Sequence, residues 1–210
     1  MTGPVWLVAG HRPGSPGART ADGVTEHAWC SAAVEAIAAE LAAEGVPFVV
    51  DVRSDTLGYE AAMRAMAKRA KQANAACLLE IHFNSAAVES GKTPPARTEV
   101  LHWPGSKRGE SLALLLACRL DEAIRPHHPQ RSPWRVVAQD RSWSASGTDA
   151  KGRPIPTGAP LYALSLPACP AVIVESHFGN SPKDHAAADK ALGSGEFVRS
   201  VVAAIREWRA

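Results

Sequence analysis

Short runs of apolar residues, separated by glycine, proline and polar residues, divide this chain into buried strands. A run of about four to eight such residues is typical of a strand that is covered on both faces. These runs predict strands at residues 5–9, 48–52, 77–83, 99–103, 135–138 and 171–175. Turn formers follow the first strand at residues 10–17, so that stretch is expected to be a loop.

Apolar residues at helical spacing predict helices between these strands. The first helix should run from residue 26 to about residue 44, with Thr25 as its N-cap and Gly45 just beyond its end. Further helices are expected at residues 59–74, 110–124 and 196–208. Strands that alternate with helices predict a single α/β domain over residues 1–210, with a largely parallel sheet.

Residues 125–160 fit this alternation least well. They contain six prolines and, apart from the short strand at 135–138, no clear period. We expect an irregular insertion that forms a lid or the wall of a groove. Its two tryptophans, Trp134 and Trp143, could line that groove, although packing against the core is the simpler expectation.

Composition narrows the class of protein only modestly. A hydrophobic content of 46% and a net charge of +2 are ordinary for a globular domain and give no reason to expect a nucleic-acid partner. The four cysteines are far apart, which argues against a disulfide framework. The N-terminus lacks a basic segment followed by a long apolar run, so we expect a chain made in the cytoplasm without a signal peptide and without membrane insertion.

Four polar residues occupy comparable positions in this pattern. His11, His82 and Glu175 fall at the carboxyl ends of predicted strands. Glu26 falls in the first turn of the helix after the first strand. Ligands of open α/β sheets bind at this edge, so we expect the four side chains to lie close together.

The residue types at that edge suit a metal-dependent hydrolase. Two imidazoles and one carboxylate are a common catalytic zinc set, and a second carboxylate can accept a proton from water. Each residue alone also has a structural interpretation, for example a helix-dipole interaction for Glu26. Glu175 is harder to explain in that way, because a carboxylate directly after a buried apolar strand is costly without a partner.

The motifs around these residues resemble those of zinc-dependent N-acetylmuramoyl-L-alanine amidases, the cell-wall amidases of bacteria and phage endolysins. The resemblance rests on Gly10-His11, on Glu26, on IHFNS at residues 81–85 and on PAVIVE at residues 170–175. Arg53-Ser54-Asp55, after the second strand, is also similar. The motifs occur in the family's order and span residues 10 to about 184.

This resemblance implies the fold, the cofactor and the reaction. It implies a largely parallel, mixed sheet of about six strands flanked by helices, and one zinc ion held by His11, Glu26 and His82. Glu175 would be the general base and acid. The substrate would be peptidoglycan, cut at the amide between N-acetylmuramic acid and L-alanine. A monomer of the phage endolysin type, released to the cell wall by a holin, is the expected form.

The chain departs from the family pattern at two positions near the motifs. Glu80 stands where a small residue is usual, and it shares a strand face with His82, so it could support the site or be paired beneath it. His177 also stands where a small residue is common, and could contact substrate or be structural. His27 is the alternative to Glu26 as a ligand, but the motif and the helix face favour Glu26.

Two other functions compete with a peptidoglycan amidase. A zinc hydrolase of small N-acyl amino acids, similar to N-formylglutamate amidohydrolase, would also place His and Glu at strand ends. IHFNS and the late glutamate argue against it. A non-catalytic wall-binding relative is disfavoured because all four site residues are present.

Overall fold

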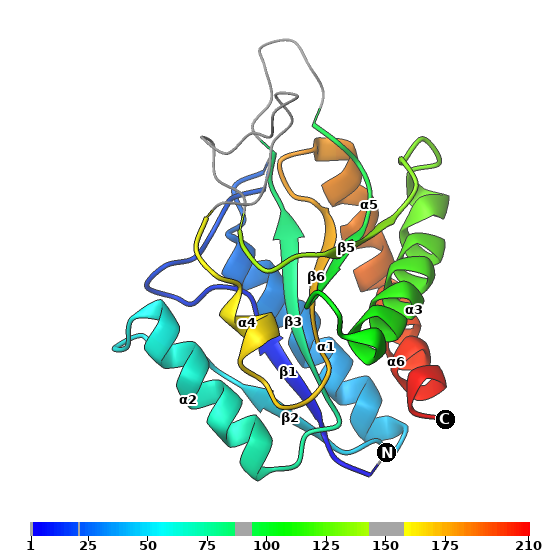
Figure 1. The fold of residues 1–210 in the computed structure, drawn as a ribbon. Coiled ribbons are helices and arrows are strands. Elements are labelled where there is room, and N and C mark those ends of the chain that lie inside the picture. Colours follow the sequence, from blue (N-terminus) through cyan, green and yellow to red (C-terminus); the bar gives the residue numbers. More distant parts are fainter. Residues whose placement is uncertain (1, 21, 87–93, 143–157) are drawn as a thin grey trace.

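The predicted strands pair into one six-stranded sheet in the order β2-β1-β3-β6-β4-β5 (Figure 1). The computed structural model describes residues 2–20, 22–86, 94–142 and 158–210. The strands are β1 (Val5–Ala9), β2 (Phe48–Asp51), β3 (Cys77–Asn84), β4 (Glu99–His102), β5 (Arg135–Ala138) and β6 (Ala171–Phe178). All neighbouring strands are parallel except β4 and β6, which are antiparallel, so the sheet is largely parallel but mixed, as expected.

Helices cover both faces of the sheet and complete the predicted α/β domain. The longer helices are α1 (Glu26–Ala43), α2 (Tyr59–Gln72), α3 (Lys107–Ile124), α5 (Pro182–Gly193) and α6 (Glu196–Arg209), and α4 (Tyr162–Ser165) is a single turn. Helices α1, α3, α5 and α6 pack on one face with the larger apolar core. Helices α2 and α4 cover only part of the other face, and α4 lies in front of the sheet in Figure 1.

The alternation of side chains along β3 decides which residues meet which face. Leu79, Ile81 and Phe83 belong to the core beneath α1 and α3. Glu80 and His82 therefore point to the opposite face, where α2 and α4 leave the upper part of the sheet uncovered. That uncovered part of the sheet carries the candidate site.

Three details differ from the sequence-based expectation. Strand β6 continues three residues beyond Glu175 to Phe178, because its pairing with β3 continues to Asn84. Glu175 therefore lies within the strand and not at its end. Helix α3 begins at Lys107, three residues earlier than predicted, with the Ser106 side chain as its cap. Helices α4 and α5 were not predicted.

The stretch from residue 125 to residue 160 is only partly described. A 3₁₀ turn, η1 (Arg125–His127), precedes β5, which confirms the strand expected there. Trp134 packs against the core, the simpler of the two expectations for it. Trp143 lies outside the described residues.

Two further observations bear on the class of protein. No helix within the described ranges is both long and apolar enough to cross a membrane. All four cysteines are free.

Candidate metal centre

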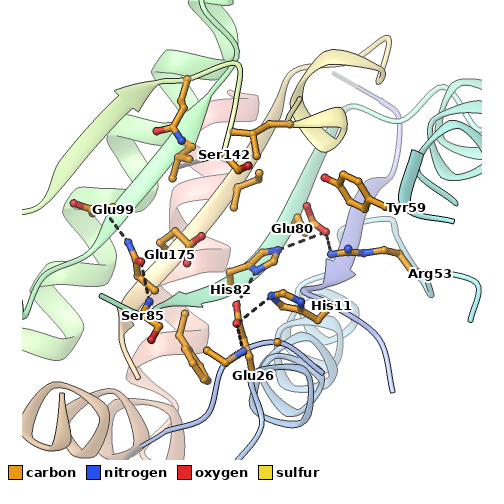
Figure 2. Close-up of a pocket in the computed structure, with 18 of the residues that line it drawn as sticks. His11, Glu26, Arg53, Tyr59, Glu80, His82, Ser85, Glu99, Ser142 and Glu175 are labelled. Atoms are coloured by element: carbon orange, nitrogen blue, oxygen red, sulfur yellow. Dashed lines mark hydrogen bonds and ion pairs between the residues drawn. The ribbon is translucent and has the colours of Figure 1, made fainter. Parts of the chain in front are cut away.

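The side chains of His11, Glu26 and His82 converge near the carboxyl ends of β1 and β3, as their positions in the sequence predict (Figure 2). Glu26 lies between the two histidines: its Oε2 is 3.1 Å from His11 Nε2, and its Oε1 is 2.8 Å from His82 Nδ1. One potential ligand atom from each of the three residues lies within 4.8 Å of the other two. The group has the composition and the spacing of a site that could hold a metal ion.

The loop after β1 brings His11 into this group. His11 has a positive φ of 61°, which turns the chain sharply where the strand ends. His27 Nδ1 is 3.0 Å from the carbonyl oxygen of Gly10 and so supports this turn. Thr25 caps α1, as predicted, and directs Glu26 inward from the first helical turn. Glu26 and not His27 therefore faces the two histidines.

Two glycines allow the backbone to approach the group closely. A Cβ atom at Gly10 would lie 2.6 Å from His82 Nδ1. At Gly17, where φ is +78°, a Cβ would lie 2.5 Å from His11 and 2.6 Å from Glu26 Oε2. Any side chain at either position would displace a potential ligand.

Glu175 lies beside this group on the neighbouring strand. It is the register partner of His82 on β3 and of Glu99 on β4. Its Oε2 is buried and makes no hydrogen bond within the described part of the chain. Burial is the largest influence on this carboxyl and, with Glu26, Glu99 and Glu80 nearby, outweighs the attraction of His82 and raises the pKa of Glu175 to about 8.

Glu80 and Arg53 form a second layer next to His82. Glu80 Oε1 lies 3.5 Å from His82 Nε2 and accepts a hydrogen bond from Arg53 Nη2. Burial would raise the pKa of Glu80, but the Arg53 guanidinium and His82 prevail and hold it at about 2. The side chain of Glu80 therefore remains charged although it is only 2% exposed.

The charges of these residues fit a divalent cation. Glu26, Glu80 and Glu175 place three carboxyl groups around His82, with Arg53 as the partner of Glu80. Burial disfavours a charged His82, but Glu26 and Glu80 overcome this and raise the pKa of His82 to about 10. A cation held by the imidazoles and Glu26 would replace that proton and compensate the buried negative charge.

The group opens into a cavity of about 860 Å³. At one end are the polar residues just described, together with Arg12 and Asn84. The rest runs over the uncovered sheet face toward β5, with an apolar part lined by Leu101, Val137, Leu161 and Ile173. A cavity of this size and mixed lining can accept an extended substrate with polar and apolar parts.

The structure also decides the position of residues that the sequence left open. His177 is buried between the rings of Trp29, Phe83 and His185, on the core side, and does not line the cavity. The contact between Arg53 and Glu80 was not foreseen, and neither was the position of Glu99 opposite Glu175. Strand alternation through residues 99–103 could have placed Glu99 on the site's face.

Fold and site together describe an α/β protein whose sheet carries a His–Glu–His group that could hold a metal ion, beside a buried carboxyl group. The family model Amidase_3, described as N-acetylmuramoyl-L-alanine amidase, matches residues 5–207. The chain therefore belongs to the N-acetylmuramoyl-L-alanine amidase family and is an enzyme of that activity. A comparison with curated proteins finds no match.

Solved structures with the same fold are amidases from several bacteria. The CwlD amidase from Clostridioides difficile, solved with the GerS lipoprotein, has a TM-score of 0.69 and 14% identity, covering 98% of both chains. AmiC2 of Nostoc punctiforme has a TM-score of 0.67 and 16% identity, and the match covers 98% of this chain and 96% of the AmiC2 chain. The catalytic domain of the CD27L endolysin, which targets Clostridia difficile, has a TM-score of 0.67 and 18% identity. The match covers 98% of this chain and 97% of the CD27L domain. At these identities the likeness establishes the fold.

Proposed function

We propose that this amidase is zinc-dependent, with one ion held by His11, Glu26 and His82, and that Glu175 moves the proton during hydrolysis. The observation that carries the proposal is the convergence of the three potential ligands within 4.8 Å of one another, next to a buried carboxyl that has an unpaired oxygen. The donor set, two imidazoles and one carboxylate, is one that zinc uses in catalytic sites and that leaves a position free.

The proposed reaction is hydrolysis of the amide that joins N-acetylmuramic acid to the L-alanine of the stem peptide. Zinc would supply a Lewis acid for the scissile carbonyl and lower the pKa of a water to about 7. Glu175 takes one proton from the attacking water and delivers it to the departing amine of L-alanine. One C–N bond breaks, one C–O bond forms, and a carboxylic acid and an amine are the products.

The other parts of the cavity position the polymer. Arg12 at the polar end can bind a carboxylate of a stem peptide. The apolar part, lined by Leu101, Val137 and Ile173, can exclude water beside the reacting amide. We infer from this that glycan and peptide lie across the strands, over the uncovered face of the sheet.

The test is digestion of isolated sacculi by purified protein, with and without zinc, followed by mass spectrometry of the soluble products. We expect free stem peptides with an L-alanine N-terminus, and no release after removal of the metal by a chelator. Release that continues in the metal-free protein would contradict zinc dependence. Release of muropeptides that keep their peptide would contradict the proposed bond.

His82→Ala tests the ligand assignment directly. We expect the variant to lose both stoichiometric zinc and hydrolysis, because two of the three ligands hold zinc far more weakly. His128→Ala is the matched control, since His128 lies in the loop after η1 and outside the cavity lining, and it should keep both properties. Stoichiometric zinc in His82→Ala, measured by elemental analysis, would overturn the assignment.

The endolysin role and the monomeric state stay predictions. Bacterial amidases and an endolysin domain are equally similar to the chain in fold, so the fold does not distinguish between these roles. Co-expression with a holin should lyse cells if the role is that of an endolysin, and expression alone should not. The alternative, a hydrolase of small N-acyl amino acids, is not favoured by the family match, and failure to hydrolyse formyl-amino acids would exclude it.

A further inference from the structure

Glu80 stands out because it is a buried carboxylate that the proposed reaction does not use. Its side chain is 2% exposed, and its neighbour Arg53 is 9% exposed. Arg53 reaches it from the loop after β2, and Figure 2 shows this pair on the side of His82 away from Glu175. Burying two charges is expensive, so a pair in this position needs an explanation.

The two nitrogens of the His82 ring face different carboxylates. Nδ1 is 2.8 Å from Glu26 Oε1, inside the potential metal site. Nε2 is 3.5 Å from Glu80 Oε1, outside it. A neutral imidazole carries one proton, and the nitrogen without it is the one that can bind a metal. If Nδ1 is the ligand atom, Nε2 carries the proton and faces Glu80 Oε1 as its acceptor.

Arg53 keeps Glu80 able to accept that proton. Its Nη2 donates to the same Oε1 that faces His82, and its guanidinium lies 5.8 Å from the centre of the Tyr59 ring. The three residues come from separate parts of the chain: β3, the β2–α2 loop and the start of α2. Packing between them limits the positions that Glu80 can take relative to the His82 ring.

A second carboxylate–guanidinium pair, on the edge strand β2, serves as the comparison. Asp51, at the end of β2, accepts hydrogen bonds from Arg69 and Trp6, and its side chain is 8% exposed. It has the same chemistry as the Glu80–Arg53 pair, but the structure records no contact from it to a residue of the potential metal site.

We propose that Glu80, held by Arg53, is a positioning residue that fixes His82 in the tautomer with the proton on Nε2 and thereby presents Nδ1 to zinc. The proposal rests on the zinc site of the proposed function. Carboxylates that accept from the distal nitrogen of a ligating histidine orient the ring and raise its basicity, and their loss costs roughly 10–100-fold in metal affinity.

The test compares zinc affinity in Glu80→Gln and in the control Asp51→Asn by chelator competition on the metal-free proteins. Glu80→Gln should bind zinc roughly 10–100-fold more weakly than the unaltered protein. Asp51→Asn weakens a carboxylate–guanidinium pair outside the site, in which Arg69 is 46% exposed, so it should lose some stability but keep the unaltered zinc affinity. Equal affinity in Glu80→Gln and the unaltered protein would overturn the proposal.

A second measurement needs no variant and so does not depend on folding of Glu80→Gln. Nitrogen-15 NMR of the zinc-loaded protein should show His82 with zinc on Nδ1 and a hydrogen-bonded proton on Nε2. Zinc on Nε2 would overturn the proposal while leaving the zinc site intact. Failure of the unaltered protein to bind zinc at all would instead reject the proposed function, so the two failures are distinguishable.

Discussion

Two groups of charged residues lie on opposite faces of the sheet, and they differ in how completely their polar atoms are paired. The first, which we call the site cluster, consists of Glu26, Glu80, Glu175, His82 and Arg53 on the uncovered face. The second, which we call the buried network, consists of Arg131, Arg125, Asp121 and Asp184 near η1 and α5.

The buried network is balanced. Two guanidinium groups face two carboxylates: Arg131 binds Asp184 at 2.6 Å and Asp121 at 3.2 Å, and Arg125 binds Asp121 at 2.8 Å. Arg131 also donates to the hydroxyl of Thr98 and to the carbonyl oxygen of Ser176, which ties the end of β6 to β4. Every charge in this group has a partner, which is what a structural group requires.

The site cluster is less completely paired. Its three carboxyl groups face one guanidinium and the His82 imidazole, and two of the three buried side-chain atoms without a hydrogen bond in the described part of the chain belong to it, Glu175 Oε2 and Arg53 Nε. A buried polar atom without a partner is costly, so a protein retains one where a ligand can pair with it. Unpaired polar atoms, and not burial of charge as such, therefore set the site cluster apart from the buried network.

The largest expected effect comes from the unpaired oxygen itself. Glu175→Gln removes the group that moves the proton, so we expect kcat on sacculi to fall roughly 10²–10⁴-fold. Zinc should remain bound, because Glu175 is not a proposed ligand. Stopped digestion assays with metal analysis of the same sample measure both. A variant with normal kcat, or one without zinc, would contradict the role given to Glu175.

The next largest effect is a loss of stability when the buried network is disrupted. Arg131→Met leaves Asp184 without its guanidinium partner and Asp121 with Arg125 alone, which should lower the free energy of unfolding by about 3–5 kcal/mol. Zinc affinity of the folded protein should not change, because the structure records no hydrogen bond or ion pair between these described residues and the site cluster. Urea unfolding measures the first quantity and chelator competition the second. A change in zinc affinity would show that the two groups are coupled.

The sequence predicts features that depend on local patterns, but not contacts between residues that are far apart in the chain. The strands and helix α1 with its Thr25 cap follow from the local spacing of apolar residues. The convergence of His11, Glu26 and His82 follows from the rule that parallel strands end at the same edge of the sheet. Arg53 and Glu80 are 27 residues apart, and their contact depends on how the β2–α2 loop packs, which no local pattern contains. The same holds for Arg131 and Asp184, at a separation of 53 residues.

Two elements were missed for local reasons. Helix α5 buries mostly alanine, so its apolar stripe is weak, and Pro182 at its start resembles a turn signal. The position of Glu175 within β6 was missed because Ser176 and His177 look like the polar end of a strand, whereas both are buried on or near the core side. Burial of polar residues depends on the tertiary structure, which hydrophobicity alone does not describe.

An effect of intermediate size tests whether zinc binds the site cluster, and it is measured as a gain in the free energy of unfolding. Zinc at about 100 times its dissociation constant should raise the free energy of unfolding by about 2.7 kcal/mol, because only the folded state contains the site. Arg131→Met should keep this increment although its baseline is lower, and His11→Ala should lose it. Magnesium, which prefers oxygen ligands, serves as the control cation. An equal increment in His11→Ala would mean that zinc stabilises the protein elsewhere.

The smallest expected effect is that of two glycine-to-alanine substitutions, which separate backbone strain from displacement of the proposed zinc ligands. Gly17→Ala and Gly105→Ala both place a Cβ at a positive φ, +78° and +82°, so both should lose about 1–2 kcal/mol of stability. At Gly105 nothing lies within 4 Å of the new atom, whereas at Gly17 it meets His11 and Glu26. Only Gly17→Ala should therefore weaken zinc binding, as chelator competition would show. If both variants keep the same zinc affinity, the loop can yield without moving the ligands, and the close approach of Gly17 is not needed to hold the site together.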